Sequence, residues 1–219
     1  MPGVDGPEPV PPEARGAISN TLVAVLQEAA DLGYLGPGPI DAHLRHAERF
    51  AAPLRATDRV LDLGTGGGVP GLVLAALLPT VAVVLVDART NRTDFLARAV
   101  GRLGWVDRVT VVPARAEALG RDVRWRGQVP AVVARSFGSP SVTAECAAPL
   151  LAVGGQLLVS EPPEPRAGRW PAAGLALVGL RADCSGGVGV ASFTQVEPCP
   201  ARYPRRRLRP ELFEAHGST

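Results

Sequence analysis

The sequence contains no lysine, and all 23 of its basic residues are arginine. Alanine, glycine, proline and valine are abundant, so we attribute this bias to a GC-rich genome and not to function. The formal net charge is only +2. Affinity for a nucleic acid would therefore have to come from local clusters of arginine and not from the overall charge of the chain.

Cysteine is scarce. Cys146, Cys184 and Cys199 are odd in number and lack the spacing of metal ligands, so we expect reduced thiols and no metal site. No N-terminal segment has the basic flank and apolar core of a signal peptide, and no apolar run approaches the length that crosses a bilayer. These absences predict a cytoplasmic protein that is not bound to a membrane.

The 219 residues, 46% of them apolar, suffice for one α/β domain with small appendages. Residues 1–16 carry repeated prolines and predict a disordered tail. Residues 17–57 predict a helical extension, because Ile18, Leu22 and similar residues recur at helical spacing before Gly33. A second helix is expected over 40–52. The main domain is assigned to 58–210 and a C-terminal tail to 211–219.

From Arg59 onward strands alternate with helices, which predicts a mostly parallel sheet covered on both faces. The expected strands lie near 59–63, 81–86, 108–113, 130–135 and 154–160, with helices near 69–78, 91–103, 115–119 and 140–151. Two further apolar runs, Leu175–Arg181 and Val188–Val196, predict a terminal antiparallel pair.

The most informative segment is the glycine loop after the first strand. Gly66–Gly71 satisfies the dinucleotide spacing G-x-G-x-x-G, a weak match in a chain with 25 glycines. Pro70 is expected in the first turn of the helix that follows. Asp62 stands at the strand end, where a carboxylate can accept hydrogen bonds from a ligand ammonium group and would repel a pyrophosphate. This favours the methionine moiety of S-adenosylmethionine over NAD. The alternative is that Asp62 only stabilises the turn.

The next strand also ends in an acid. Asp87 follows the apolar run Val81–Val86, about where a carboxylate would bind the two hydroxyls of a ribose. The alternative is that Asp87 only caps the following helix. Because two successive strands end in an acid, a ligand site is the stronger interpretation.

Two later segments are candidates for the same edge of the sheet. Arg115–Ala116–Glu117 follows the third strand, where its backbone would frame an adenine, or it is simply an exposed helix start. Arg135 follows the fourth strand, so its burial would require a partner anion. We expect a site role for Arg135. The alternative is a structural ion pair with Glu145 or another helix acid.

These motifs together resemble those of one family, the glucose-inhibited division protein B (RsmG) methyltransferases. The resemblance spans roughly residues 17–210, and the Pro70–Gly71 pair after the glycines makes it fairly specific. The matching segments are Asp62–Gly71, Asp87 with Arg92 and Phe95–Leu96, Arg115–Glu117, Arg135 before Phe137, and Tyr203–Arg206.

The resemblance implies a class I S-adenosylmethionine-dependent methyltransferase: a Rossmann-like, doubly wound, mostly parallel seven-stranded sheet with an N-terminal helical extension. It implies methylation of a guanine N7 in 16S ribosomal RNA, with that RNA or the small ribosomal subunit as partner, by a monomer without metal. The implied cofactor residues are Asp62, Gly64, Thr65, Gly66, Gly68, Asp87, Ala116, Glu117 and Arg135, of which Arg135 is also the catalytic candidate. The implied RNA-binding residues are Arg115, Arg205, Arg206 and Arg207.

The chemistry of N7 fits what the chain offers. Guanine N7 presents a lone pair and carries no proton, so its methylation needs alignment and no general base. The sequence shows no Ser/His/Asp set and no plausible nucleophilic cysteine, which argues against methylation at cytosine C5. We expect Arg135 on a phosphate or on guanine O6, because a guanidinium at N7 would cover the reacting atom and face the positive charge that forms there.

Two departures from the family pattern leave alternatives open. An Arg-His pair followed by Asp-Ser becomes Ala42–Ala47, and a Lys-Gly pair becomes Ser160–Glu161. His43 and His46 are expected to be surface or packed residues of a helix and not to bind a ligand. These departures allow a paralogue that acts on another RNA, or an inactive cofactor-binding protein of ribosome assembly. An NAD-dependent oxidoreductase rests on the glycine spacing alone.

Overall fold

The computed structural model describes residues 18–164, 167–183, 189–206, 208 and 213. The predicted tail 1–16, Cys184, Arg207 and most of the predicted tail 211–219 lie outside these residues. The domain boundaries at 17, 58 and 211 stay predictions. Cys146 and Cys199 are unbridged thiols.

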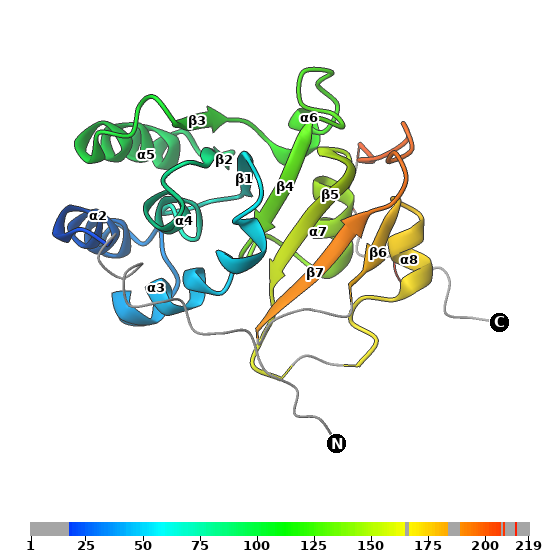
Figure 1. Ribbon diagram of the computed structural model, residues 1–219, viewed down its shortest axis with the longest axis horizontal. Helices are drawn as coiled ribbons and strands as arrows, with labels where there is room; N and C mark the ends of the chain where they lie inside the picture. Colours follow the sequence, from blue (N-terminus) through cyan, green and yellow to red (C-terminus); the bar gives the residue numbers. More distant parts are fainter. Residues whose placement is uncertain (1–17, 165–166, 184–188, 207, 209–212, 214–219) are drawn as a thin grey trace.

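Seven strands form one mixed sheet in the described part of the chain, in the order β3-β2-β1-β4-β5-β7-β6 (Figure 1). The first five strands pair in parallel, and β7 runs antiparallel to both β5 and β6. Their bounds are β1 (Arg59–Leu63), β2 (Ala82–Asp87), β3 (Val109–Pro113), β4 (Val129–Ala134), β5 (Leu151–Ser160), β6 (Leu180–Ala182) and β7 (Val190–Gln195). The predicted mostly parallel seven-stranded fold is confirmed.

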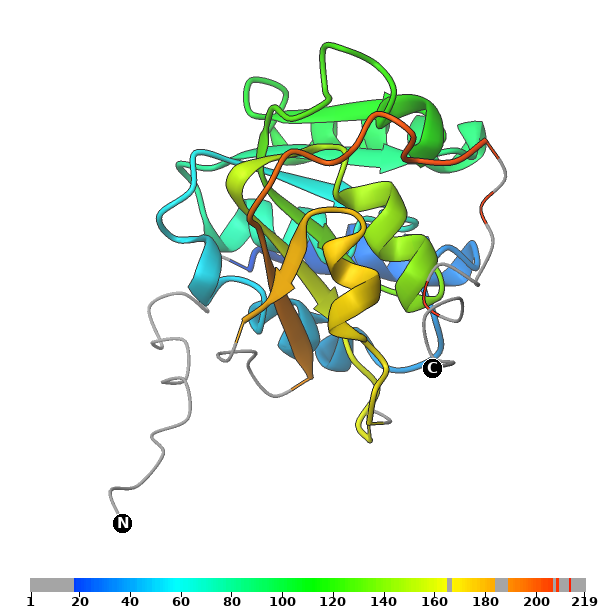
Figure 2. The same ribbon diagram turned by 90° about the vertical axis from the view of Figure 1, so that its right-hand side faces the viewer.

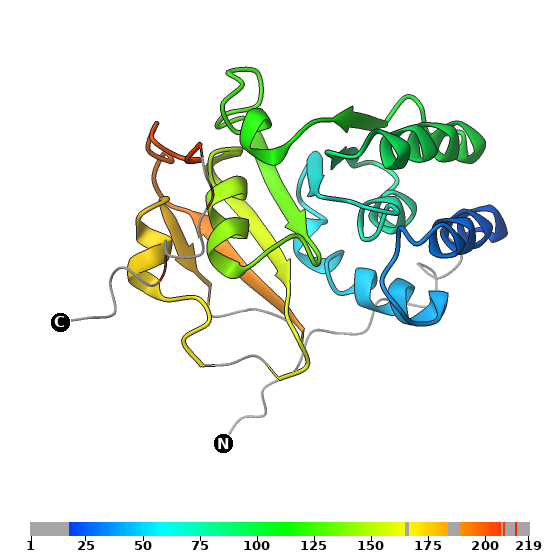
Figure 3. The same cartoon turned by 180° about the vertical axis from the view of Figure 1, so that it is seen from behind.

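Helices cover both faces of the sheet. The bounds are α2 (Asn20–Asp31), α3 (Ile40–Glu48), η1 (Ala52–Leu54), α4 (Gly71–Leu77), α5 (Thr90–Leu103), α6 (Ala116–Leu119), α7 (Pro140–Ala147) and α8 (Ala172–Ala176). The apolar sides of α2–α5 bury in one core and those of α6–α8 in another. Figure 3 shows the molecule from behind, with α7 and α8 in front of the sheet. Figure 2 shows it from the side, turned by 90° from Figure 1. No helix among the described residues is long and apolar enough to cross a membrane.

The strand order reverses direction between β1 and β4, both central in the sheet. Parallel sheets bind ligands at the carboxyl ends of the strands beside such a reversal. Asp62 near the end of β1, Asp87 at the end of β2 and Arg135 just after β4 all lie at this edge. The fold therefore brings together residues that are more than seventy positions apart in the chain.

One predicted strand is only partly a strand. The run Leu175–Arg181 was expected to be extended, but its first residues complete helix α8 and only Leu180–Ala182 forms β6. Leu175 and Val178 are both fully buried three positions apart, which suits a helical turn packed on the second core. Short apolar runs fit both the helical and the strand period, so the burial of Leu175 and Val178 decided that this run begins as a helix. The antiparallel pairing of β6 with β7 is confirmed.

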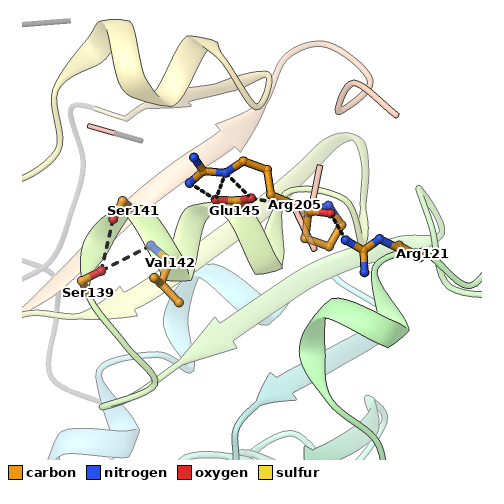
Figure 4. Close-up of polar contacts among 7 residues, drawn as sticks. Arg121, Ser139, Ser141, Val142, Glu145 and Arg205 are labelled. Atoms are coloured by element: carbon orange, nitrogen blue, oxygen red, sulfur yellow. Dashed lines mark hydrogen bonds and ion pairs between the residues drawn. The ribbon is translucent and has the colours of Figure 1, made fainter. Parts of the chain in front are cut away.

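The segment that follows β7 is fixed to α7 by a buried ion pair (Figure 4). Glu145 is fully buried and accepts hydrogen bonds from the backbone N and the guanidinium of Arg205, at 2.6 Å from N and 2.7 Å from Nη2. Arg126 donates to the carbonyl oxygens of Tyr203 and Cys199 in the same segment. These contacts join a basic stretch of the C-terminal part to the structural core.

We expect Glu145→Ala to lower the free energy of unfolding by about 3 kcal/mol, because it removes the buried carboxylate that accepts from the guanidinium and the backbone N–H of Arg205. Urea denaturation followed by circular dichroism measures the loss. Glu197→Ala, at an exposed glutamate beyond β7, is the matched control and should change stability by less than about 0.5 kcal/mol. Equal stability of the two variants would contradict a structural role for the pair.

Candidate active site

The loop after β1 folds across the end of β2. The backbone N atoms of Gly64 and Thr65 both lie 2.9 Å from the carbonyl oxygen of Val86 and donate to it. Gly66 and Gly68 have φ angles of 58° and 95°, in the left-handed region that favours glycine. Pro70 precedes α4 and does not lie in its first turn, a difference of one residue from the prediction, and its peptide bond to Val69 is cis.

Part of the glycine requirement comes from the protein itself. A Cβ atom on Gly67 would lie 2.7 Å from Leu35 Cδ2, and the Gly67 N–H donates to the Tyr34 carbonyl at 3.0 Å. A Cβ on Gly64 would lie 2.5 Å from the ring of Phe137. Leu35 after α2 and Phe137 after β4 therefore both pack against the loop.

Asp62 fixes the loop through hydrogen bonds to its backbone and to a side chain. Its Oδ2 accepts hydrogen bonds from Thr65 Oγ1 at 2.6 Å and from Gly71 N at 2.8 Å. A Cβ on Gly71 would collide with Leu85 and lie 2.7 Å from Oδ2. The structural alternative for Asp62, a turn-stabilising contact, is thus present.

The second carboxylate oxygen of Asp62 differs from the first in its hydrogen bonding. Oδ1 is buried and has no hydrogen-bond partner among the described residues. Burial raises the pKa of Asp62 to about 6, while Thr65, Gly71 and Arg135 oppose the shift. A buried oxygen without a donor is costly, so a ligand donor at Oδ1 would relieve that cost. An ammonium group is a donor of this kind.

Asp87 connects the loop to the start of α5. Its Oδ2 accepts from Gly66 N at 3.0 Å and from Arg92 Nη1 at 3.3 Å, and its Oδ1 accepts from Arg89 N at 2.9 Å. The residue before α5 is Arg89, which makes no side-chain cap, so Asp87 is not the cap of this helix. Asp87 and Asp62 therefore both bond to the glycine loop.

Arg135 faces the loop from β4 and is held by a histidine of the N-terminal extension. Its Nη2 lies 2.6 Å from His43 Nδ1, and His43 Nε2 lies 3.1 Å from the Gly36 carbonyl oxygen. A guanidinium only donates, so Nδ1 accepts and Nε2–H donates to Gly36, which fixes a neutral tautomer. Burial and the charge of Arg135 lower the pKa of His43.

The predicted alternative, an ion pair between Arg135 and Glu145, is therefore wrong. Glu145 pairs with Arg205 instead. His43 was expected on the surface or packed within its helix, and it is 98% buried. Its contact with Arg135, 92 positions away, had no signal in the sequence. His46, also on α3, packs its ring against Phe50, and burial lowers its pKa to about 4.

Two cavities of about 310 Å³ each meet at Ser136. Ser136 has a φ of 53° and is the one residue other than glycine with a positive φ in the described part of the chain. Such backbone geometry gathers at functional sites. The glycine-loop cavity is lined by Gly33–Gly36, Gly64–Gly66, Val69, Arg92, Arg135 and Ser136. The Trp170 cavity is lined by Ser136–Gly138, Pro140, Thr143, Val159–Pro162, Arg169 and Trp170.

The remaining predicted residues divide between two regions. Ala116 is buried at the start of α6, and the Ala114 N–H donates to the Asp87 carbonyl at 3.1 Å, so this turn adjoins the site. Arg115 and Arg206 are exposed. The segment that contains Arg205 contacts Arg126 before β4, whereas Arg135 follows β4. The structure therefore does not bring Arg205 together with the cofactor candidates.

Two solved structures with a similar fold are methyltransferases. The O-methyltransferase from Bacillus cereus in complex with SAH is 17% identical with a TM-score of 0.58, covering 82% of this chain and 92% of that one. A SAM-dependent O-methyltransferase from Thermotoga maritima is 14% identical with a TM-score of 0.55, covering 84% and 73%. The fold is that of the class I SAM-dependent methyltransferases.

Sequence relatives define the family. The family rRNA small subunit methyltransferase G (GidB) matches residues 42–162, more than half of the chain. The ribosomal RNA small subunit methyltransferase G of Rubrobacter xylanophilus is 37% identical over 168 residues, which cover 70% of this chain and 64% of that protein. The one from Mycolicibacterium gilvum is 32% identical over 163 residues, covering 68% and 70%. The chain belongs to the rRNA small subunit methyltransferase G family. It spans 42% of a Synechococcus relative, so coverage of these proteins is partial.

The raised pKa of Asp62 predicts a pH-dependent stability. The folded protein keeps this proton up to a pH of about 6, whereas the unfolded chain loses it near the ordinary value of 3.8. The free energy of unfolding should therefore fall, as pH rises through this window, by about 3 kcal/mol relative to Asp62→Asn. Urea denaturation of both proteins across the window measures the difference. Parallel pH curves would show that Asp62 ionises as in the unfolded chain.

Proposed function

We propose that the protein is an S-adenosylmethionine-dependent methyltransferase that acts on a guanine N7 of 16S ribosomal RNA. The observation that carries the proposal is the buried Oδ1 of Asp62, which has no donor among the described residues and stands beside a glycine loop at the end of β1. Membership of the methyltransferase G family supports the RNA substrate. We place the protein in the cytoplasm as a monomer, with the RNA or the small ribosomal subunit as its partner.

We assign each part of the cofactor to residues that line the glycine-loop cavity or lie next to it. Asp62 Oδ1 accepts from the ammonium group, and Gly64, Thr65, Gly66 and Gly68 supply the backbone around the methionine moiety. Asp87 binds the ribose hydroxyls, since a carboxylate keeps acceptor capacity beyond its bonds to Gly66, Arg89 and Arg92. The backbone of Ala116 and Glu117 frames the adenine.

We assign Arg135 to the cofactor. It lines the glycine-loop cavity and not the Trp170 cavity, so the anion that it fits is the carboxylate of the cofactor. His43 positions the guanidinium by accepting from Nη2, which leaves the other donors for the ligand. Arg115 and Arg206 are exposed and available to phosphates.

The bound cofactor supplies a methyl group that is already activated on a sulfonium. The lone pair of guanine N7 forms the new bond to the methyl carbon, and the electrons of the broken carbon–sulfur bond stay with sulfur. No proton moves, so the protein's contribution is alignment of the two reactants. A carboxylate at the position of Asp62 disfavours a pyrophosphate and hence the NAD-dependent alternative.

Methyl transfer tests the proposal directly. Small ribosomal subunits and their RNA are isolated from a strain that lacks the gene and incubated with the protein and cofactor carrying a radiolabelled methyl group. We expect label in 7-methylguanosine of the small-subunit RNA and little in RNA from the parent strain. Tight cofactor binding without any label in RNA would instead support the inactive ribosome-assembly protein.

Asp87→Asn should weaken binding of S-adenosylhomocysteine by about tenfold to a hundredfold, because charge-assisted hydrogen bonds to the ribose are lost. Isothermal titration calorimetry measures the affinity. Asp94→Asn, at an exposed position of α5, is the matched control and should bind like the wild type. Unchanged affinity in Asp87→Asn, at unchanged thermal stability, would remove Asp87 from the site.

A further inference from the structure

The Trp170 cavity contains a carboxylate that the cofactor does not use. Glu161 follows β5, and its side chain is only 8% exposed. Its Oε1 accepts from Trp170 Nε1 at 2.8 Å and from Arg169 Nε at 3.2 Å. Its Oε2 lies 3.1 Å from Arg169 Nε but accepts no hydrogen bond from the described residues and is shielded from solvent. The cavity therefore holds a carboxylate that is paired with Arg169 and has one oxygen without a well-aligned donor among the described residues.

Two aromatic residues, Phe137 and Trp170, line this cavity. Trp170 is fixed by its bond to Glu161 and by Phe193, whose ring centroid lies 4.5 Å away. Phe137 lines the cavity and also packs against Gly64 of the glycine loop. A volume of about 310 Å³ is at the lower end of the size of small-ligand pockets. Enzymes that modify a base hold it, turned out of the stack, between aromatic or apolar side chains in such a pocket.

We propose that the Trp170 cavity binds the acceptor guanine and that Glu161 Oε2 accepts a hydrogen bond from its N1–H and N2 amino edge. Guanine is the one standard RNA base with adjacent donors on its Watson–Crick edge, whereas adenine and cytosine present an acceptor beside their amino group. A carboxylate rewards adjacent donors and repels an acceptor. The inference rests on the proposed function and adds the residue that selects the base.

The position of Glu161 also fits the charge that develops in the reaction. Methylation at N7 leaves the purine with a positive charge, which makes N1–H a stronger donor. The bond to Glu161 is therefore stronger in the transition state than in the bound substrate, which is the condition for catalysis by binding. Ser136, shared by both cavities, lies between the base and the cofactor.

Nucleotide binding tests the inference without methyl transfer. In the presence of S-adenosylhomocysteine, calorimetry compares guanosine and adenosine monophosphates, which carry the same sugar and phosphate. We expect the wild type to prefer the guanine nucleotide by about tenfold or more, and Glu161→Ala to lose that preference. Glu161→Gln should retain part of it. Equal affinity for both nucleotides in the wild type, or no saturable guanine binding in the millimolar range, would overturn the inference.

Two controls separate a base-selecting role from a structural one. Glu197→Gln, at an exposed glutamate beyond the opposite end of β7, should keep the wild-type preference. Thermal unfolding and binding of S-adenosylhomocysteine should be alike in all variants; a Glu161 variant that loses both nucleotides equally, with lower stability, would show that Glu161 only holds Arg169 and Trp170. Failure of the wild type to label RNA, with guanine preference intact, would reject the reaction and keep the base site.

Discussion

The site depends on one buried carboxylate, Asp62. It stands near the end of β1, where the strand order of the sheet reverses, and its Oδ2 joins Thr65 of the loop to Gly71 at the start of α4. Gly71 has no room for a side chain because Asp62 and Leu85 occupy the space. Burial of this charge is unfavourable, which is reflected in its raised pKa. Arg135 offsets part of that cost from β4.

The N-terminal extension is part of the site and not only a cover for the sheet. Tyr34 accepts from Gly67 of the loop, and His43 accepts from Arg135. His43 thus joins two segments: it donates to the Gly36 carbonyl of the extension and accepts from Arg135, which follows β4. The position of the guanidinium in the cavity therefore depends on the position of the extension. A change in α3 would therefore reach the cofactor through Arg135, although α3 itself carries none of the proposed ligands.

The two departures from the family pattern have different meanings in the folded protein. In the first, the chain keeps a histidine at 43, and this is the residue that contacts Arg135. In the second, Glu161 lies in a cavity beside the cofactor residues, paired with Arg169 and Trp170. The first segment therefore supports Arg135, and the second contributes a buried acceptor.

The sequence by itself determined the class of fold and the edge at which the site lies. Apolar runs that end in Asp62 and Asp87, glycines at fixed spacing and alternating periods are local signals, and strand ends of a parallel sheet share one edge. The contacts of Arg135 with His43 and of Arg205 with Glu145 join residues 92 and 60 positions apart, and no local pattern encodes them. Only the tertiary structure decided which arginines support the site and which hold the C-terminal segment, because a guanidinium finds its acceptor through packing and not through spacing.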